Sequence, residues 1–240
     1  SSSCRLALFL RLPYCRLIRG KYTAGIDRVI ATTPKQRGEL VDTLTRYQPW
    51  QVSPTRRVYI PKANGKLRPL GISTIVDRCM QTVVKTALEP EWEAQFEAST
   101  YGFRPGRSCH DAVQKLYFMG LPKNRKHWAV DADLKGCFDN LDQNFVLSAI
   151  GQFPGRELIN QWLKAGYIEY GSWRPTDAGV PQGNTIAPLL ANIALHGMED
   201  ALGVRYDSRG RLYGKRGLVK YADDFVRHEA RIMHGARAPA

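Results

Sequence analysis

The spacing of apolar and polar residues along the chain predicts short strands and helices in mixed order. Residues 128–134 alternate between apolar and polar side chains, as a half-buried strand does. Apolar residues recur at helical spacing after Pro34, which predicts a helix that ends near Tyr47. The same criteria predict helices at 77–96 (interrupted by Pro90), 109–119, 144–150, 157–165 and 187–202, and strands at 58–61, 212–213 and 218–226. Because no strand–helix–strand order repeats, we expect an α+β fold and not a doubly wound sheet.

The segment VYIPKANGKLRPLGI, residues 58–72, predicts a β-hairpin. Asn64-Gly65 is a strong turn signal, and it lies between two apolar runs. Lys62 and Arg68 flank this turn, so the hairpin is expected to carry positive charge near its tip. A basic hairpin that binds nothing and is simply solvated would have the same pattern.

The charge of the chain favours a polyanionic partner. Lys and Arg number 35 against 22 Asp and Glu, which gives a formal net charge of +13. Neutralising phosphates with such side chains releases counterions, so nucleic acid is the expected partner. A basic ribosomal-type protein or a membrane-surface protein would have a similar balance. With 43% hydrophobic residues, the chain is otherwise ordinary for a folded domain.

Cysteine usage indicates a reducing compartment, and the hydropathy of the chain argues against a membrane span. The five cysteines include no C-x-x-C pair, which argues against a disulfide framework and a structural zinc site. The apolar run at residues 6–10 is far shorter than the roughly 20 residues that a membrane span needs. We therefore expect a protein of the cytoplasm, or of an organelle matrix, that has no membrane partner.

Three aspartates are candidates for a metal site. Asp133 lies near the end of the strand predicted at 128–134, and Asp223-Asp224 interrupt the apolar segment VKYADDFV. Adjacent carboxylates among strand-forming residues repel each other unless a cation lies between them. At the tip of a hairpin they would suit Mg²⁺, which prefers oxygen ligands. An ordinary turn is the alternative, because Asp is common in turns.

Beyond this pair, several blocks resemble one family in the order in which that family has them. VKYADDFV resembles the Y-x-D-D signature of reverse transcriptases. VYIPKANGKLRPLGISTIVDRCMQ, YGFRPGRSCHDAV, DLKGCFDNLD and AGVPQGNTIAPLLANIAL resemble blocks of the group II intron-encoded reverse transcriptases, the maturases of bacteria and organelles. The resemblance covers residues 20–226. It implies the fingers and palm of a right-hand polymerase, with helices packed on an antiparallel palm sheet.

The resemblance also implies roles for the residues that match these motifs. Asp133, Asp223 and Asp224 would be catalytic, and with the Leu134 carbonyl they would hold two Mg²⁺ ions, for which Mn²⁺ could substitute. The remaining expected contacts are Lys62, Arg68, Phe138 and Gln182 with the dNTP, and Arg104 and Arg107 with nucleic acid.

Phe138 falls where the family has an aromatic gate against the 2′-hydroxyl. A ring under the sugar leaves no room for a ribose oxygen, so deoxynucleotides would be selected. Without the resemblance, a core residue would be the simpler interpretation of this phenylalanine. Gln182 matches the residue that contacts the incoming nucleotide or the template.

The activity implied is RNA-directed DNA polymerisation, a nucleotidyl transfer from a dNTP to a primer 3′-hydroxyl. The expected partners are group II intron RNA as template, a DNA primer or target and dNTP, with a maturase role in splicing for full-length relatives. Two alternatives stay open. One is an inactive RNA-binding or splicing remnant, and the other is an RNA-dependent RNA polymerase, which Phe138 disfavours.

The chain departs from the family's pattern at three places. Asn184 stands where the family commonly has a second glycine after P-Q-G. Residues 1–19 are expected to be a poorly matching basic lead-in, and residues 227–240 an unmatched, disordered tail. A helical thumb and a maturase domain do not fit into that tail. We therefore expect fingers and palm without a thumb, with weak or no polymerase activity by this chain alone.

Overall fold

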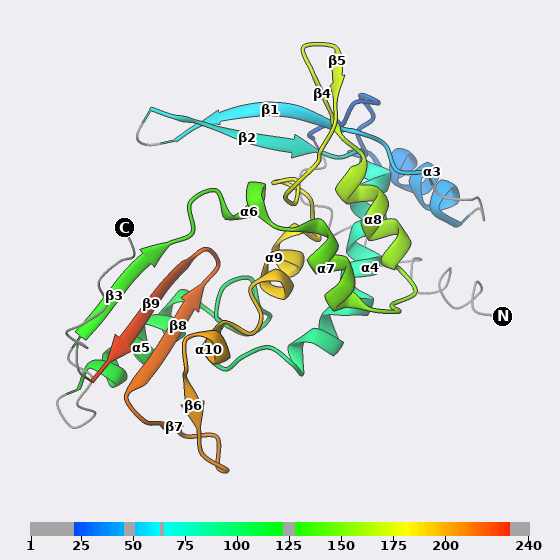
Figure 1. Cartoon of the computed structure of the whole chain (residues 1–240). Helices are drawn as coiled ribbons and strands as arrows, with labels where there is room; N and C mark the ends of the chain where they lie inside the picture. The colour runs from blue at the N-terminus through cyan, green and yellow to red at the C-terminus, as the bar shows by residue number, and fades with distance from the viewer. Residues whose placement is uncertain (1–21, 46–50, 63–64, 122–127, 231–240) are drawn as a thin grey trace. The chain divides into compact units, whose positions relative to one another are not determined.

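The fold is that of a computed structural model, which describes residues 22–45, 51–62, 65–121 and 128–230 (Figure 1). The expected lead-in at residues 1–19 lies outside the described residues. The chain divides into two compact units, the first from Ser1–Glu91 and Phe138–Leu190, the second from Trp92–Cys137 and Ala191–Ala240. Each unit combines a sheet with helices, so the expected α+β class is confirmed.

The first unit contains a four-stranded sheet in the order β2-β1-β4-β5. Its strands are β1 (Thr55–Pro61), β2 (Leu67–Ile72), β4 (Tyr167–Glu169) and β5 (Ser172–Arg174). β1 and β2 form the predicted antiparallel hairpin, seen as the long cyan ribbon in Figure 1. Gly65 adopts φ 76° in its turn, a conformation that glycine tolerates; Asn64 of the expected turn is outside the described part. The short strands β4 and β5 were not predicted, because three-residue strands leave little periodicity.

The described helices that lie wholly in the first unit are α3 (Pro34–Thr45), α7 (Gln143–Ile150) and α8 (Arg156–Lys164). Three other described helices cross the boundary between the units along the chain: α4 (Ile75–Glu93), α6 (Cys137–Asn140) and α9 (Ala187–Ala194). Helix α4 continues through Pro90, so the predicted interruption is wrong. Leu40 of α3 is buried against Ile75 and Cys79 of α4, which agrees with the predicted apolar face.

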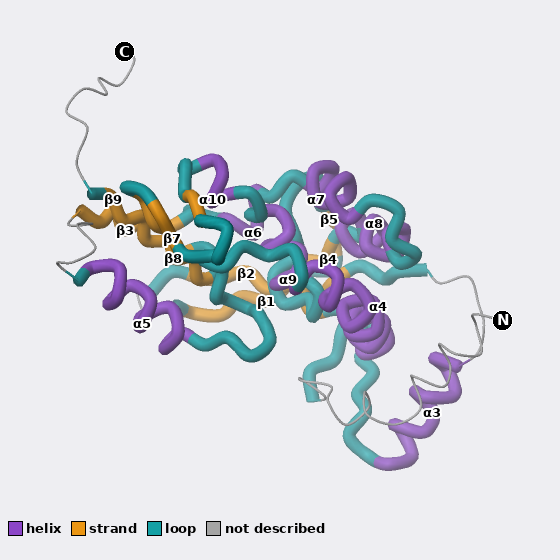
Figure 2. The backbone as a smooth tube through the Cα atoms, turned by 90° about the horizontal axis from the view of Figure 1, so that it is seen from below, coloured by secondary structure: helices purple, strands orange, loops and turns teal. Residues whose placement is uncertain are grey.

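The second unit is built on a three-stranded antiparallel sheet in the order β3-β9-β8. The strands are β3 (Trp128–Asp133), β8 (Arg216–Tyr221) and β9 (Asp224–Glu229), and the helix is α5 (Cys109–Gly120). α5 lies along one face of the sheet (Figure 2), where its Ala112 and Met119 pack against Val219 of β8. Its start is fixed by a reciprocal capping box between Ser108 and Asp111. Smaller elements are α10 (Met198–Ala201), β6 (Arg205–Tyr206) and β7 (Leu212–Tyr213).

Three predictions about local structure need correction. The helix expected at 187–202 is divided into α9 and α10, and Gly197 between them adopts φ 90°. β9 continues through Glu229, so the expected tail does not begin at residue 227; residues 231–240 are outside the described part. In β3 every residue except Ala132 is exposed, because α5 packs on β8 and β9. None of the helices described is long and apolar enough to cross a membrane.

Candidate functional site

The three expected catalytic aspartates lie at one end of the sheet of the second unit. Asp133 is the last residue of β3, and it pairs in register with Asp224, the first residue of β9. The backbone N–H of Leu134 donates to the carbonyl oxygen of Asp223 over 3.0 Å. The strand that carries Asp133 is therefore bonded to the tip of the Y-A-D-D hairpin.

The tip of the Y-A-D-D hairpin is held by residues 99–102, which lie beside it. Tyr101 N–H donates to Lys220 O, and Lys220 N–H donates to Ser99 O, each over 2.8 Å. A Cβ on Gly102 would collide with the backbone nitrogen of Ala222, the turn residue that adopts φ 59°. The glycine of the YGFRPGRS block thus permits close approach of backbone to the tip.

The fold disfavours the charged form of Asp224. The pKa of Asp224 is raised above its usual value, first by burial and then by the neighbouring charges of Asp223, Asp133 and Asp131. The pKa of the buried Cys137 thiol is also raised, mainly by burial, with contributions from Asp223 and Asp133. A cation at this end of the sheet would relieve the repulsion.

The donor set fits magnesium in its chemistry. Three carboxylates and the Leu134 carbonyl offer only oxygen atoms, which Mg²⁺ prefers. Among the described residues, however, no three His, Cys, Asp or Glu side chains stand close enough together to form a metal-binding group. The backbones therefore converge at this point, whereas the side chains are not assembled around a common position.

A buried ion pair behind the hairpin was not predicted. Lys220 of β8 is only 1% exposed, and its Nζ donates to Leu195 O over 2.7 Å and lies 3.5 Å from Glu97 Oε2. Burial lowers the pKa of Lys220, whereas Glu97 opposes that shift. A lysine inside the apolar run LVKYADDFV was the signal in the sequence that could have indicated it.

Arg104, expected at nucleic acid, is instead a structural residue. Its guanidinium donates to both carboxylate oxygens of Glu93, at 2.8–3.2 Å, and to the carbonyls of Glu97 and Thr100, each over 3.1 Å. Its side chain is 6% exposed, so no donor remains for a phosphate. That expectation is corrected: the donors that a phosphate would need close a loop of the protein.

Arg107 has a different environment. It is exposed, and its guanidinium lies over the ring of Tyr101 at 5.2 Å. With Lys115 and Phe118 it borders a shallow cavity of about 340 Å³ in the second unit. Basic and aromatic side chains together are typical of surfaces that bind single-stranded nucleic acid. The expected role of Arg107 therefore stays a prediction.

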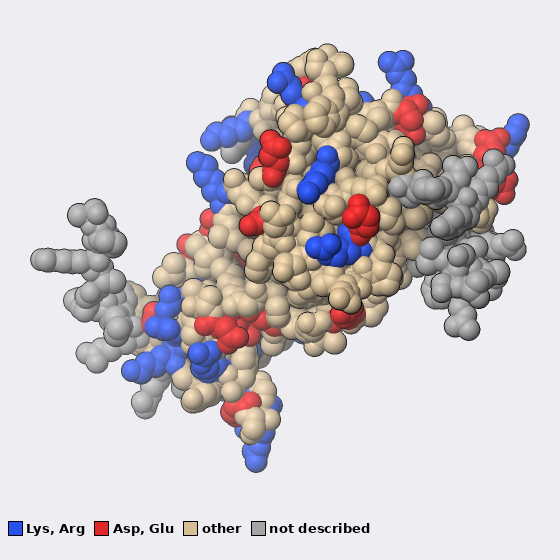
Figure 3. Space-filling model, turned by 45° about the vertical axis from the view of Figure 1, so that its right-hand side comes forward, with Lys and Arg blue, Asp and Glu red and all other residues tan. Residues whose placement is uncertain are grey.

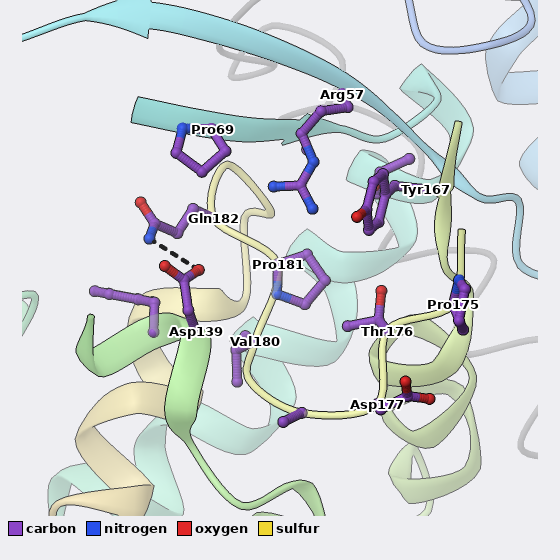
Figure 4. A pocket seen from close by; sticks show the side chains of 14 residues that line it. Arg57, Pro69, Asp139, Tyr167, Pro175, Thr176, Asp177, Val180, Pro181 and Gln182 are labelled. Atoms are coloured by element: carbon purple, nitrogen blue, oxygen red, sulfur yellow. Dashed lines mark hydrogen bonds between the residues drawn. The ribbon is translucent and has the colours of Figure 1, made fainter. Parts of the chain in front are cut away.

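The first unit contains a cavity of about 360 Å³ beneath the hairpin of β1 and β2. Phe138, 8% exposed, and Asp139 form part of its wall, and Gln182 lies at its edge (Figure 4). On the opposite side the guanidinium of Arg57 stacks on the Tyr167 ring, 3.9 Å from its centre. The cavity is thus lined both by Phe138, which is expected to exclude the 2′-hydroxyl, and by Gln182, which is expected to contact the nucleotide or the template.

The other expected nucleotide contacts lie on the hairpin. Arg68 of β2 is exposed, and its Nε donates to Gln182 Oε1 over 2.8 Å. Lys62 is exposed beside the turn, and its backbone N–H closes the hairpin by donating to Lys66 O over 2.7 Å. The structure therefore brings Arg68 and Gln182 together and places Lys62 in the turn of the same hairpin.

Asn184 has a structural reason to replace the family's second glycine. Its side chain is buried, and its Oδ1 accepts a hydrogen bond from the hydroxyl of Ser73, which follows β2. The adjacent Thr185 N–H donates to Gln81 Oε1 of α4 over 2.9 Å. The departure therefore fastens the loop before α9 to its neighbours and does not disrupt it.

The positive charge is not gathered on one surface in the view of Figure 3. On that face, the Lys and Arg side chains of the described residues are interspersed with Asp and Glu. The net charge of +13, summed over the whole chain, therefore supports a polyanionic partner. The face in Figure 3 shows no continuous basic patch.

The comparison with protein families gives one match across most of the chain. The family described as reverse transcriptase (RNA-dependent DNA polymerase) matches residues 60–231. Protein YkfC of Escherichia coli is 36% identical over 87% of this chain, and the group II intron-encoded protein LtrA of Lactococcus lactis is 43% identical over 61%. The chain spans 64% of the length of the first relative and 25% of the second.

Solved structures with the same fold include polymerases of two kinds. An apo telomerase of Candida tropicalis superposes with a TM-score of 0.54 at 15% identity, covering 75% of this chain and 44% of that one. A Cas6-RT-Cas1–Cas2 complex gives a TM-score of 0.50 at 22% identity, covering 95% and 24%. At these identities the likeness concerns the fold alone, and it confirms the expected fingers-and-palm fold.

Proposed function

This chain belongs to the reverse transcriptase family, and we propose that it catalyses RNA-directed DNA synthesis by nucleotidyl transfer. The reaction joins a dNTP to the 3′-hydroxyl of a primer and releases pyrophosphate. The observation that carries the proposal is the pairing of Asp133 with Asp224 beside Asp223 at the end of one sheet. Two-metal catalysis needs carboxylates from neighbouring strand ends, and here the backbones of two such strands bring the three aspartates to one end of the sheet.

Asp133, Asp223, Asp224 and the Leu134 carbonyl would hold the metal, two Mg²⁺ ions in the proposal. When bound, these ions would activate the primer hydroxyl and neutralise charge on the triphosphate. The raised pKa of Asp224, which comes first from burial and then from the charges of Asp223, Asp133 and Asp131, supports the proposal, because a cation would offset both causes. The tight turn at Ala222, supported by Gly102, would keep the two hairpin carboxylates in place.

The first unit would bind the nucleotide. Lys62 and Arg68 would neutralise the triphosphate, because both are exposed cations on one hairpin. Phe138 would exclude the 2′-hydroxyl; its ring is largely buried, and its place in the cavity wall supports this role. Gln182 would contact the nucleotide or the template from the edge of that cavity.

The relatives suggest the nucleic acid. LtrA is by name a group II intron-encoded protein, and the yeast relatives are named as intron proteins. We therefore propose group II intron RNA as template, a DNA primer or target, and a role in splicing for the whole protein. Its compartment would be the bacterial cytoplasm or an organelle matrix.

Extension of a DNA primer on an RNA template by the purified chain tests this function. We expect weak Mg²⁺-dependent extension with dNTPs, because the chain is expected to have fingers and palm without a thumb, and less with rNTPs. Asp223→Ala should lower the rate by at least about 10³-fold, since loss of metal binding removes several kcal/mol of charge stabilisation. Asp131→Ala, which removes the same charge from β3, should change it by less than about threefold. Extension that does not require Mg²⁺, or equal extension by wild type and Asp223→Ala, would contradict the proposal.

The choice of sugar is tested with a second variant. Phe138→Ala should admit rNTPs, because the ring that occupies the place of a 2′-oxygen is removed. Equal discrimination between dNTP and rNTP by the variant and the wild type would show that Phe138 is a core residue only. A thermal melt should accompany the assay, because removing a buried ring also costs about 3–5 kcal/mol of stability.

A further inference from the structure

Three side chains of the first unit form a hydrogen-bonded chain at the edge of the cavity. Arg68 Nε donates to Gln182 Oε1 over 2.8 Å, and Gln182 Nε2 donates to Asp139 Oδ1 over 3.2 Å. The second bond is the dashed line in Figure 4. The three residues come from β2, from the loop before α9, and from α6 directly after Phe138.

The chemistry of the two outer groups determines how the middle amide is oriented. A guanidinium can only donate hydrogen bonds, and a carboxylate can only accept them. Gln182 must therefore turn its oxygen towards Arg68 and its nitrogen towards Asp139. Without Asp139, the amide could rotate about its last bond and present its nitrogen to the guanidinium, which would repel it.

The backbone under the chain is fixed independently. Gly71 N–H donates to Gln182 O over 2.7 Å, and Val180 N–H donates to Phe138 O over 2.7 Å. Gly183 adopts φ 104°, and a Cβ there would lie 2.8 Å from Gly71 O. The loop is thus bonded to both β2 and α6, so removing the Asp139 side chain should alter the orientation of the amide and not the fold.

The bond from Gln182 also orients Arg68. It uses Nε, and among the described residues the terminal nitrogens Nη1 and Nη2 of Arg68 have no hydrogen-bonding partner. A guanidinium held by Nε presents these two nitrogens as a fork, the geometry that binds phosphate oxygens. The orientation of Arg68 therefore depends, through one amide, on the carboxylate of Asp139.

We propose that Asp139 is a positioning residue for the incoming nucleotide: it fixes the amide of Gln182, which in turn aims Arg68 at the triphosphate. The inference rests on the proposed function and deepens it, because it concerns how the same site recognises a dNTP. Asp139 itself would not touch the nucleotide. Its effect should therefore be on affinity, and it should require Gln182.

A double-mutant cycle tests the dependence. The dissociation constant of dGTP is measured with Ca²⁺ on a complex of the chain with an RNA template and a dideoxy-terminated DNA primer. Asp139→Ala should weaken binding about five- to tenfold, the net scale of one typical hydrogen bond. In a Gln182→Ala background, the same change should have less than a twofold effect. Equal weakening in both backgrounds would overturn the proposal.

Exchange of the two groups gives a rescue experiment. Gln182→Glu alone places two carboxylates against each other, so we expect weak binding. Adding Asp139→Asn supplies an amide N–H to the new carboxylate and should restore affinity to within about threefold of wild type. If the double exchange recovers no affinity for dGTP, the proposed positioning of Arg68 by Asp139 through Gln182 is contradicted.

Asp177→Ala is the matched control, because Asp177 is an exposed carboxylate that lines the same cavity. This variant should keep an affinity for dGTP within twofold of wild type. A loss equal to that of Asp139→Ala would show that any negative charge in the cavity has the same effect, and it would overturn the proposal. All variants should have the melting temperature of the wild type, since Asp139 and Asp177 are exposed and Gln182 is partly exposed. A chain that binds dGTP but extends the primer equally well after Asp223→Ala would overturn the proposed function alone. A chain that binds no dGTP would overturn both.

Discussion

Asp133 and Asp224 face each other across the ladder of β3 and β9. Directly opposed residues in an antiparallel pair project on the same face of the sheet, with Cβ atoms about 4.5–5.5 Å apart. Like charges in such a pair are destabilising, so the pairing has an energetic cost in the absence of a counterion. In the proposed function, a cation at this end of the sheet would offset that cost.

The first prediction concerns that cost and its dependence on pH. The pKa of Asp224 is raised in the fold, so the folded chain binds the proton more tightly than the unfolded chain does. The ionised group therefore lowers stability at pH values above its raised pKa, and the penalty disappears as pH falls through that pKa towards the unfolded value. In EDTA at about pH 7, Asp224→Asn should raise the free energy of unfolding, by less than about 1 kcal/mol because the group is solvent-exposed.

Urea denaturation at several pH values checks this prediction. The difference between Asp224→Asn and wild type should shrink as the pH is lowered towards about 4. Added Mg²⁺ should stabilise the wild type and not the variant, because only the wild type retains the full set of ligands. A variant less stable than wild type in EDTA would show that the ionised carboxylate has a compensating partner.

The second prediction concerns Gly102, which lies against the hairpin tip. Gly102→Ala adds a methyl group that would collide with the Ala222 nitrogen, so the tip must move. We expect a loss of about 1–3 kcal/mol of stability from overpacking and a larger loss of primer extension. Gly120→Ala, where an added Cβ meets no atom within 4 Å, is the control and should preserve both. Full activity of Gly102→Ala would show that the position of the tip is not critical.

The third prediction concerns the buried pair of Lys220 and Glu97. Lys220→Met should lower the free energy of unfolding by about 3–5 kcal/mol, because it leaves the buried Glu97 carboxylate unpaired. Adding Glu97→Gln should recover part of that loss, since a neutral amide tolerates burial better. Urea denaturation measures both, with Lys85→Met, from a surface pair with Glu89, as a control that should lose less than about 0.5 kcal/mol. Additive losses in the double variant would contradict the pairing.

The fourth prediction separates the two arginines of the YGFRPGRS block. Arg107→Gln should weaken binding to RNA and reduce the slope of log Kobs against log salt by about one, because a phosphate contact is lost. Arg104→Gln should leave that slope unchanged and lower the melting temperature, since its guanidinium closes a loop through Glu93. The reverse pattern, with the slope changed by Arg104→Gln alone, would restore Arg104 as a nucleic-acid contact.

The sequence predicted the parts of the site that depend on local pattern and order. The hairpin at 58–72, strand β3 and the adjacent aspartates all follow from periodicity or turn chemistry. It could not show that Arg104 is used internally, because a basic loop has the same composition whether its donors face solvent or Glu93. The resemblance added a role for that arginine that its hydrogen bonds contradict.

The sequence also could not predict contacts between residues that are far apart along the chain. Lys220 finds Glu97, and Gln182 finds Asp139, across stretches of chain that no local pattern connects. The division of the helix at Gly197 and the continuation of β9 to Glu229 were missed for a related reason. Tertiary packing, and not propensity, decides where such elements end.

Cleavage of the chain by bound Fe²⁺ tests most directly whether the three aspartates hold metal together. Fe²⁺ replaces Mg²⁺ in oxygen-ligand sites, and with ascorbate and peroxide it cuts the nearby backbone. We predict cuts next to both Asp133 and Asp223-Asp224, suppressed by excess Mg²⁺ and absent from Asp224→Asn, with fragments identified by mass spectrometry. Cuts at one of the two segments alone, or cuts unchanged in Asp224→Asn, would contradict a shared metal site at this end of the sheet.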